Sequence, residues 1–426
     1  MSSAPLSEVL SRLDALIDWE RRSRAAMRVT TDPARALSER LGAPHERLRV
    51  VHVTGSKGKG STSALIAAGL GAAGLRVGRY GSPHVERINE RVVIAGREID
   101  DAELAEGLER ALDARAALVA ADSAIEPTWF DVVTAAALWC IERQRVDWLV
   151  AEVGLGGRLD STNILRGEVC VLTNVELEHT QVLGGTRALI AREKVGILKP
   201  GSTLVTSLAA EDEAGAVVAA HAAELGCQVL RPAWAGATPP LAVERANRDL
   251  AELALDELGR RGVAGPAGPV AGRLLSDAVA SQARLPGRRE RFALRGRQVV
   301  LDGAHTPGSV TALLRELVRE PELAGRPLVA VVGLARDKDS AAILKALGER
   351  AERVICTSVG TALHRSADEL LLELEAVGGR GEALTPPRAA VDRAIALADQ
   401  GWVLVTGSLH LAGAVRAHLI ELAPPA

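Results

Sequence analysis

The sequence predicts an α/β protein with two domains of unequal size, each built around a parallel sheet. Three observations support this. The chain has 426 residues, more than a single hydrophobic core usually serves. Hydrophobic residues make up 47% of the chain but aromatic residues only 2%, so the cores must be aliphatic. Short apolar stretches alternate with helical ones, which is the pattern of successive strand–helix–strand units.

Charge, cysteine usage and hydropathy exclude several classes of protein. Lys and Arg total 51 against 54 Asp and Glu, and nothing suggests the basic face that a nucleic-acid partner requires. The four cysteines form no CxxC pair, which argues against structural zinc and fits free thiols in a reducing cytoplasm. The charged N-terminus lacks the apolar core of a signal peptide, and no charge-free apolar run reaches the roughly 18 residues of a membrane helix. We therefore expect a cytoplasmic protein that interacts with neither nucleic acid nor membrane.

The N-terminal domain is expected over residues 1–290. Residues 6–42 should be mostly helical, with a turn near Asp32-Pro33. A buried strand over 49–54, a Gly-rich turn over 55–60, a helix over 61–73 and a strand over 75–80 follow one another. This order predicts a βαβ unit. The later elements of this domain are a helix over 131–143 and strands over 147–153, 169–175 and 202–207.

Two breaks in the pattern bear on the domain boundary. The stretch 261–273 is rich in Gly, Pro and Ala, and is either a loop of the first domain or a flexible excursion near its end. The second break, Leu285–Arg289, is followed by a new α/β series. We therefore place the boundary near residues 290 to 297, with Pro286–Arg289 as the candidate hinge. The smaller, Rossmann-like second domain should span 297–426, with strands over 298–302, 328–333, 353–357 and 402–406.

The segment Gly55–Thr62, GSKGKGST, has the composition of a phosphate-binding loop between a strand and a helix. Glycines let backbone N–H groups turn toward an anion, and the helix N-terminus adds positive potential. Lys59 can reach the β and γ phosphates, and Ser61 or Thr62 can offer a hydroxyl to Mg²⁺. The spacing departs from GxxxxGK[ST] because a Gly follows the Lys. A glycine turn without a ligand is the alternative, but strand, loop, Lys and hydroxyl occur in the order that a P-loop-type domain demands.

Four further segments end or follow predicted strands, where α/β sheets collect their ligands: 81–84 (GSPH), 152–160 (EVGLGGRLD), 178–180 (EHT) and 193–197 (EKVGI). Glu152 lies at the end of a very apolar strand, where a carboxylate is costly unless it is paired or bound to metal. Magnesium prefers oxygen ligands, which Glu152 and Ser82 supply. The alternatives are a structural acid paired with Arg or Lys for Glu152, a turn residue for Ser82, and a cap or core residue for His179.

Together these segments resemble the folylpolyglutamate synthase/dihydrofolate synthase family of the Mur ligase superfamily. The resemblance runs from about Val51 to about Arg416. It is carried by the motifs HVTGSKGKGST, GSPHVERINER, EVGLGGRLDSTN, EHTQVLGGT, REKVGILKPG, LDGAHTP, GLARDKD and VTGSLHLAG. Two departures are Lys57, where the family often has Asn although some branches have Lys, and Thr306, where an Asn often follows DGAH.

The resemblance implies roles by position. The ATP phosphates would be held by Gly58, Lys59, Gly60 and Ser61. Two Mg²⁺ sites would draw on Ser61, Ser82, Glu152, His179 and a carboxylated Lys194. Further ATP contacts would come from Asn247, opening the helix NRDLAELAL, and from Arg288, Asp302 and His305; whether Arg288, Arg289 or Arg291 meets ATP is open. The pterin would be contacted by Gly156, Gly157 and Arg158 and by the segment Thr128, Trp129 and Phe130, whose aromatic rings could stack on it. From the residues alone, an ordinary salt bridge of Lys194 with Glu193 or a nearby Asp is the simpler interpretation.

The implied reaction is ATP-dependent ligation of L-glutamate to the carboxylate of dihydropteroate, a reduced folate or both. A γ-phosphoryl transfer would give an acyl phosphate, which the glutamate amine attacks. Family precedent favours a monomer. Because an acyl phosphate hydrolyses easily, we also expect the second domain to close over the first and exclude water. One alternative is a related ligase with another acceptor such as a cell-wall UDP-peptide, although we expect too little chain ahead of Gly55 for its extra domain. Others are a P-loop kinase or NTPase and a binding module with an inactive site.

Overall fold

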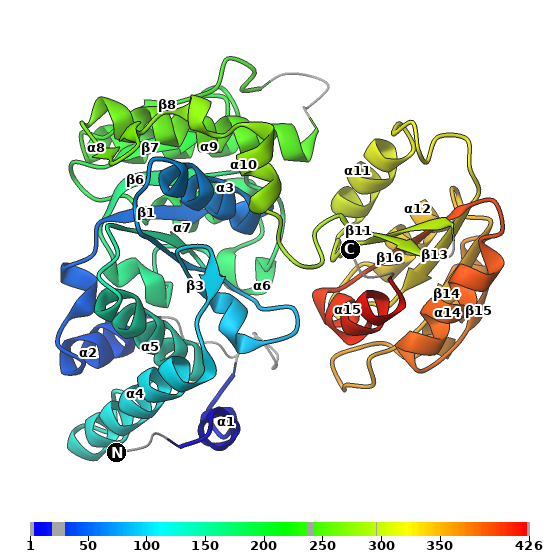
Figure 1. The fold of residues 1–426 in the computed structure, drawn as a ribbon, viewed down its shortest axis with the longest axis horizontal. Coiled ribbons are helices and arrows are strands. Elements are labelled where there is room, and N and C mark those ends of the chain that lie inside the picture. Colours follow the sequence, from blue (N-terminus) through cyan, green and yellow to red (C-terminus); the bar gives the residue numbers. More distant parts are fainter. Residues whose placement is uncertain (1–3, 19–29, 237–241, 295, 424–426) are drawn as a thin grey trace. The chain divides into compact units, whose positions relative to one another are not determined.

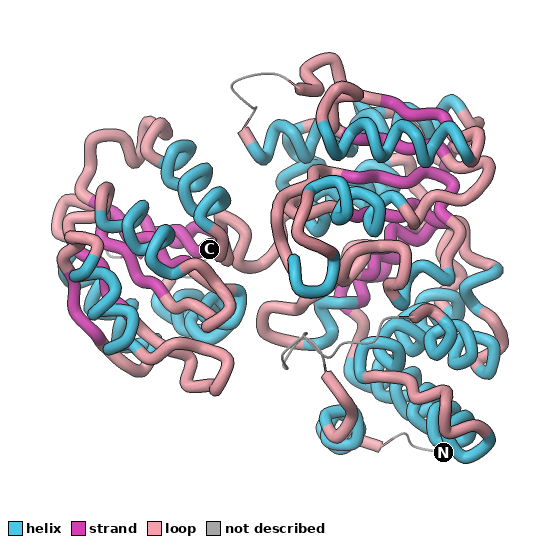
Figure 2. The backbone as a smooth tube through the Cα atoms, turned by 180° about the vertical axis from the view of Figure 1, so that it is seen from behind, coloured by secondary structure: helices cyan, strands magenta, loops and turns pink. Residues whose placement is uncertain are grey.

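The computed structural model describes residues 4–18, 30–236, 242–294 and 296–423, and the chain divides into two compact units. The N-terminal unit is Met1–Ala283 and the C-terminal unit is Arg284–Ala426. Each unit has its own sheet with helices packed on it (Figure 1; Figure 2 gives the view from behind). The predicted two-domain α/β architecture is confirmed.

The N-terminal unit has an eight-stranded sheet in the order β4-β3-β2-β5-β1-β6-β7-β8. Its strands are β1 Val50–Thr54, β2 Val77–Tyr80, β3 Val92–Ile94, β4 Arg97–Glu98, β5 Trp148–Glu152, β6 Gly167–Leu172, β7 Thr203–Thr206 and β8 Gln228–Leu230. All adjacent pairs from β2 to β8 are parallel, whereas the β2–β3 and β3–β4 pairs are antiparallel. The register aligns Val53 of β1 with Glu152 of β5 and with Val171 of β6. The carboxyl ends of these three central strands therefore lie together at one edge.

Alternate side chains of β1 point to opposite faces of this sheet, and helices cover both faces. Val50 belongs to a cluster with helices α4 and α5, while Val51 and Val53 belong to a second cluster with α3 and α9. Every residue of β1 is buried, as expected for a central parallel strand. The helices of the unit are α1 Leu6–Asp14, α2 Asp32–Arg40, α3 Lys59–Ala72, α4 Asp101–Ala121, α5 Trp129–Arg143, α6 Thr180–Leu183, α7 Arg187–Val195, α8 Glu213–Glu224, α9 Val243–Arg260 and α10 Asp277–Gln282.

The C-terminal unit has a six-stranded sheet in the order β11-β12-β16-β13-β14-β15. Its strands are β11 Glu290–Leu294, β12 Arg297–Leu301, β13 Leu328–Val332, β14 Arg353–Cys356, β15 Gly381–Ala383 and β16 Trp402–Thr406. Its helices are α11 Pro307–Leu317, α12 Ser340–Gly348, α13 Ala367–Ala376, α14 Pro387–Leu397 and α15 Leu409–Leu422. Only β11 runs antiparallel to its neighbour among these described strands. Because β11 bonds to β12, residues 290–294 lie in the sheet of the second unit, and the units divide ahead of the expected boundary.

Several local expectations differ from the structure. Asp32-Pro33 opens α2 instead of forming a turn, because proline is well tolerated in a first helical turn. Helix α9 starts at Val243, so Asn247 lies in its second turn and does not open it. Within 261–273 the short strands β9, Ala264–Gly265, and β10, Gly268–Pro269, form a hairpin. Part of the predicted helical stretch 6–42, namely 19–29, lies outside the described residues.

No helix in the described part of the chain is both long enough and apolar enough to cross a membrane.

Candidate active site

The glycine loop lies between β1 and α3, and close packing explains two of its glycines. Gly58, with φ of +81°, is the N-cap of α3, and a methyl group there would collide with the Asn247 side-chain amide. A methyl group on Gly55, with φ of +148°, would collide with the Thr173 hydroxyl. Asn247 is buried, so α9 brings its amide directly against the loop even though the residue does not start that helix.

Lys59 is the first residue of α3, and its side chain folds back over the loop. Its Nζ donates to the main-chain oxygens of Gly55, at 2.9 Å, and Ser56, at 3.4 Å. Gly60 and Ser61 follow in the same first turn and are half-buried. An ammonium group beside a helix N-terminus and a left-handed glycine forms a cradle that suits phosphate.

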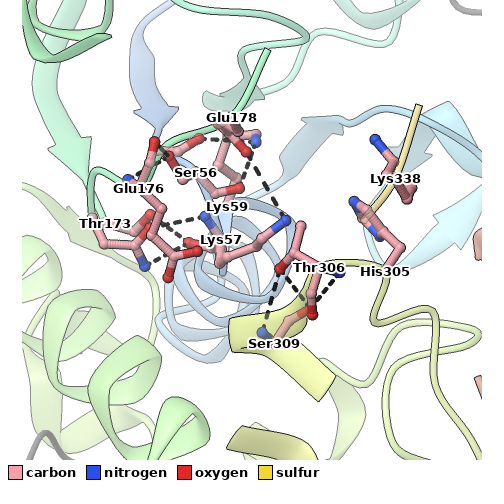
Figure 3. Close-up of polar contacts among 12 residues, drawn as sticks. Ser56, Lys57, Lys59, Thr173, Glu176, Glu178, His305, Thr306, Ser309 and Lys338 are labelled. Atoms are coloured by element: carbon pink, nitrogen blue, oxygen red, sulfur yellow. Dashed lines mark hydrogen bonds and ion pairs between the residues drawn. The ribbon is translucent and has the colours of Figure 1, made fainter. Parts of the chain in front are cut away.

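Two polar residues after β6, which the sequence analysis missed, hold this loop in place (Figure 3). The Asn174 side chain accepts from Lys57 N at 2.9 Å and donates to Lys57 O at 3.2 Å. The Thr173 hydroxyl donates to the same Lys57 oxygen at 2.6 Å. These two residues could have been found in the sequence as a polar Thr-Asn pair directly after an apolar strand. That strand, β6, pairs with β1, which leads into the loop.

Lys194, on α7, reaches the same loop from a buried position. Its side chain is 2% exposed, and its Nζ donates to Glu178 Oε1 at 2.9 Å and to Gly55 O at 2.9 Å. Burial lowers the pKa of Lys194 to about 8, although the Glu178 carboxylate opposes the shift. The alternative partner Glu193 instead pairs with Arg158 at 2.7 Å. Gly55 O thus accepts from both Lys59 and Lys194.

Glu178 is the carboxylate around which the lysines gather (Figure 3). Its Oε1 bonds to Lys194, and its Oε2 lies 4.0 Å from Lys57 Nζ. Burial alone would raise the pKa of Glu178, but Lys194, Lys59 and Lys57 together outweigh burial and hold that pKa well below its usual range. In the sequence, Glu178 stands out only as the neighbour of His179.

Glu152 and Ser82 lie at the same sheet edge, where Glu152 is the last residue of β5 and Ser82 follows the end of β2. Glu152 is 6% exposed. A methyl group on Gly81 would lie 3.0 Å from Glu152 Oε2 and 3.0 Å from Arg79 Nη1, so this carboxylate and this guanidinium flank Gly81. Burial lowers the pKa of Arg79, and the charge of Glu152 opposes that shift. Arg79 is therefore the basic residue that a purely structural role for Glu152 would require.

The chemistry of these donors decides whether a divalent cation fits. The described residues include no group of three or more His, Cys, Asp or Glu arranged to hold a metal. Magnesium uses few protein ligands and completes its shell with water and substrate phosphates, so hydroxyl and carboxylate oxygens beside a phosphate loop suffice. His179 caps the short helix α6 in a left-handed conformation, with φ of 47°, directly after Glu178. The donor set fits magnesium bound together with a nucleotide.

The loop Gly156–Arg158 is fixed on two sides. Gly156 O accepts from the Thr54 hydroxyl at 2.7 Å, and Arg158 N donates to Glu193 O at 2.7 Å. A methyl group on Gly157 would lie 2.7 Å from Lys194 O and 2.8 Å from Glu193 O. The predicted pterin loop therefore packs directly on the helix that carries Lys194.

The three residues of the aromatic segment, Thr128, Trp129 and Phe130, have different surroundings. Thr128 caps α5 in a reciprocal capping box with Asp131. Trp129 is 2% exposed beneath the Arg91 guanidinium and borders a cavity of about 400 Å³, also lined by Leu10 and His84. The half-buried Phe130 packs on Gly154, so it adjoins the loop that carries Gly156 and Gly157. This position favours Phe130 over Trp129 for stacking on a ligand.

The remaining ATP candidates lie in the C-terminal unit. Asp302 follows β12 and accepts from the backbone N–H groups of Arg289, at 2.9 Å, and Ala304, at 2.8 Å. Burial raises the pKa of Asp302, and the charge of Arg288 opposes that shift. His305 Nδ1 lies 2.8 Å from Gly303 O.

Local contacts indicate which of the neighbouring arginines can meet a nucleotide. They also explain why Thr306 can stand where the family often has Asn. Arg289 pairs with Glu316 at 2.7 Å, and Arg291 pairs with Glu320, which favours Arg288 as the arginine that meets a nucleotide. Thr306 caps α11 in a capping box with Ser309 (Figure 3). Asn and Thr are both good N-caps, so the departure from the family pattern keeps this function.

Comparisons with known proteins agree with these motifs. The family described as "Mur ligase, glutamate ligase domain" matches residues 287–409. The chain is 33% identical to folylpolyglutamate synthase of Lacticaseibacillus casei over 89% of this chain and 92% of that protein. A structure of E. coli FolC in complex with DHPP and ADP superposes with a TM-score of 0.82 at 30% identity, covering 99% of each chain. A bifunctional folylpolyglutamate synthase/dihydrofolate synthase of Yersinia pestis, complexed with AMPPNP and Mn ion, has a TM-score of 0.80 at 30% identity, covering 99% of each chain.

Proposed function

The chain belongs to the folylpolyglutamate synthase/dihydrofolate synthase family, and we propose that it ligates L-glutamate to the carboxylate of a pteroate or folate at the expense of ATP. The observation that carries this proposal is the convergence of Lys59 and the buried Lys194 on Gly55 O. A phosphate loop that only bound nucleotide would need Lys59 alone. The second lysine, held by Glu178, equips the loop for a step beyond nucleotide binding.

Nucleotide binding is assigned to the loop and its neighbours. The phosphates would rest on Gly58, Lys59, Gly60 and Ser61, with Lys59 turning from Gly55 O toward the β and γ oxygens. Asn247, Arg288, Asp302 and His305 are proposed as further ATP contacts. The relative structures contain ADP, AMPPNP and Mn, and we propose Mg²⁺ for this chain.

Metal binding is assigned to Ser61, Ser82, Glu152 and His179, with a carboxylated Lys194, in two sites. A bound divalent cation would neutralise charge on the phosphates during transfer. Glu152 offers a buried carboxylate at the sheet edge that the loop shares. Burial brings Lys194 close to the neutral form that can capture CO₂, which supports the carbamate.

The acceptor is assigned to Phe130 and the loop Gly156–Arg158, with Thr128 and Trp129 supporting that surface. Phe130 presents a ring beside Gly154, and the Gly157 backbone packs against the Lys194 segment. An acceptor bound on this loop would therefore have its carboxylate near the phosphate end of the nucleotide. Phosphoryl transfer would then depend on positioning and charge neutralisation, and exclusion of water would protect the acyl phosphate. A monomeric state and a cytoplasmic location stay predictions.

A P-loop kinase or NTPase is the competing function, and the required co-substrates separate the two. The purified chain should be incubated with ATP, Mg²⁺, L-glutamate and a panel of dihydropteroate, reduced folates and unrelated carboxylates. We expect ADP release only when glutamate and a pteroate or folate are both present, and a product heavier by one glutamyl residue. ADP release without glutamate would contradict the proposal, and activity with an unrelated carboxylate alone would assign the chain to a different acceptor.

A further inference from the structure

Lys57 stands in the glycine loop where the family often has Asn, and the proposed function gives it no role. Its backbone is held by Thr173 and Asn174, so the start of its side chain is fixed in direction. Its Nζ lies 4.0 Å from Glu178 Oε2, while Glu178 Oε1 bonds to Lys194 (Figure 3). The side chains are largely buried: Lys57 is 21% exposed, Glu178 11% and Lys194 2%. One carboxylate is thus shared between two lysines in surroundings where water screens charge weakly.

The net formal charge of Glu178, Glu176 and the three lysines near them changes from +1 to −1 if Lys194 is carboxylated. Lys57, Lys59 and Lys194 act on Glu178, and Lys57 and Lys194 also act on Glu176. Arg187 also acts on Glu176 but is paired with Asp212 at 2.6 Å. In the modification, the neutral Lys194 nitrogen attacks the carbon of CO₂, a C=O electron pair moves onto oxygen, and a proton leaves the nitrogen. Three lysines facing two carboxylates then become two lysines facing three anions.

We propose that Lys57 is a positioning residue that serves as the counter-ion of Glu178 and thereby allows Lys194 to carry a carbamate. Once Lys194 becomes an anion, it repels Glu178, and Lys57 is the lysine already placed at the other oxygen of that carboxylate. Without Lys57, Lys59 would be the lysine left to balance Glu178 beside the carbamate, and Lys59 is also needed for phosphate. The proposal rests on the proposed function because it assumes the carbamate.

The test measures the carbamate itself in the full-length protein. A ¹³C carbamate signal is titrated with ¹³C-bicarbonate at fixed Mg²⁺ and pH, without nucleotide. We expect Lys57→Met to raise the bicarbonate concentration for half-maximal signal at least about tenfold, since an opposite charge near 4 Å in a partly buried site is removed. Lys57→Arg, which keeps the charge, should stay within about threefold of the unmodified chain. Lys345→Met removes an exposed lysine of α12 and should behave like the unmodified chain.

A double variant separates charge from loop structure. Lys57→Met combined with Glu178→Gln removes both members of the pair and should recover most of the carbamate lost in Lys57→Met, giving strong non-additivity. Equal half-maximal bicarbonate in Lys57→Met and the unmodified chain would overturn the proposal, as would a double variant no better than Lys57→Met. If Lys57→Met fails to fold, Lys57→Gln takes its place. An unmodified chain without any carbamate signal also overturns the proposal, whereas glutamate-dependent ADP release from that chain would leave the ligase function standing.

Discussion

At the scale of single residues, the site depends on how one main-chain oxygen, Gly55 O, is shared between Lys59 and Lys194. Sequence reasoning assigned a role to each lysine separately, because the loop motif and the REKVGI segment are local patterns. It could not show that both ammonium groups meet at one carbonyl, or that Glu178 instead of Glu193 pairs with Lys194. Lys194 lies 139 residues from Gly55 and 16 from Glu178 along the chain, so no local pattern reports these contacts.

Removing Lys59 tests the phosphate assignment. Lys59→Ala should cost about 3 kcal/mol of transition-state stabilisation, roughly a hundredfold or more in kcat, by analogy with the loss of one preorganised donor. Circular dichroism and the melting temperature should be nearly unchanged, because the side chain packs on the loop and not in the core. Near-normal turnover in a folded variant would remove Lys59 from the mechanism.

Glu152→Gln distinguishes a metal ligand from a structural acid. The variant keeps the shape and removes the charge, so we expect weaker Mg²⁺ binding by calorimetry, lost turnover and little change in melting temperature. Glu257→Gln is the matched comparison, since Glu257 is 4% exposed and pairs with Arg261 at 2.9 Å. That variant should lose stability and keep its Mg²⁺ dependence. If Glu152→Gln behaves like Glu257→Gln, Glu152 is the structural partner of Arg79.

The lowered pKa of Lys194 predicts how carboxylation depends on pH. Only the neutral amine attacks CO₂, and burial moves the pKa from 10.5 to about 8. The initial rate of carbamate formation at a fixed CO₂ concentration should therefore rise as pH increases through about 8 and then level off. Acid should reverse the modification, because protonation returns the lysine to its cationic form. A rate that keeps climbing toward pH 10.5 would show an unperturbed lysine.

At the scale of elements, the pterin loop and helix α7 behave as one packed piece. Gly157→Ala would press a methyl group against the backbone oxygens of Glu193 and Lys194, which cannot move as a flexible side chain would. We expect a loss of about 1–3 kcal/mol in the free energy of unfolding and a larger loss of turnover, as Lys194 shifts. The matched control is Gly185→Ala, whose added methyl group meets nothing within 4 Å. Equal effects of the two substitutions on urea unfolding and on turnover would contradict the coupling.

The long central elements could be predicted from the sequence, while the short ones at the sheet edges could not. Strands such as β1, β5 and β16 are mostly apolar and are buried at every residue, as expected for central parallel strands covered on both faces. Strands β3, β4 and β15 are two or three residues long, too short to show a period, and depend on pairing with a neighbour. Asn247 does neighbour the glycine loop, and its contact with a nucleotide stays a prediction, but its helix starts four residues earlier than the sequence suggests.

In the molecule as a whole, the residues proposed to bind ATP and metal come from both compact units. Lys59 and Lys194 lie in the first unit, and Arg288 and Asp302 in the second. The fold class follows from alternating strands and helices, whereas the division between Ala283 and Arg284 depends on β11 pairing with β12. The segment Glu290–Leu294 alone does not reveal which sheet it joins.

Ligand-driven closure is the prediction at this scale, with Pro286–Arg289 as the proposed hinge. Solution scattering should show a smaller radius of gyration when ATP, Mg²⁺, acceptor and glutamate are present together than when any one is missing. A radius that is the same in all ligand states would argue against closure. The forward scattering from the same samples reports the molecular mass and so tests the predicted monomer.

Whether glutamate joins the acceptor through an acyl phosphate can be determined by following the oxygen atoms of the acceptor carboxylate. The acceptor carboxylate is labelled with ¹⁸O and incubated with ATP, Mg²⁺ and L-glutamate, and the inorganic phosphate is analysed by mass spectrometry. We predict that each amide formed transfers one ¹⁸O atom to phosphate, because the carboxylate oxygen that takes the phosphoryl group leaves with it. Phosphate that appears without label, or in equal amount without glutamate, would rule out an acyl phosphate on the route to the amide.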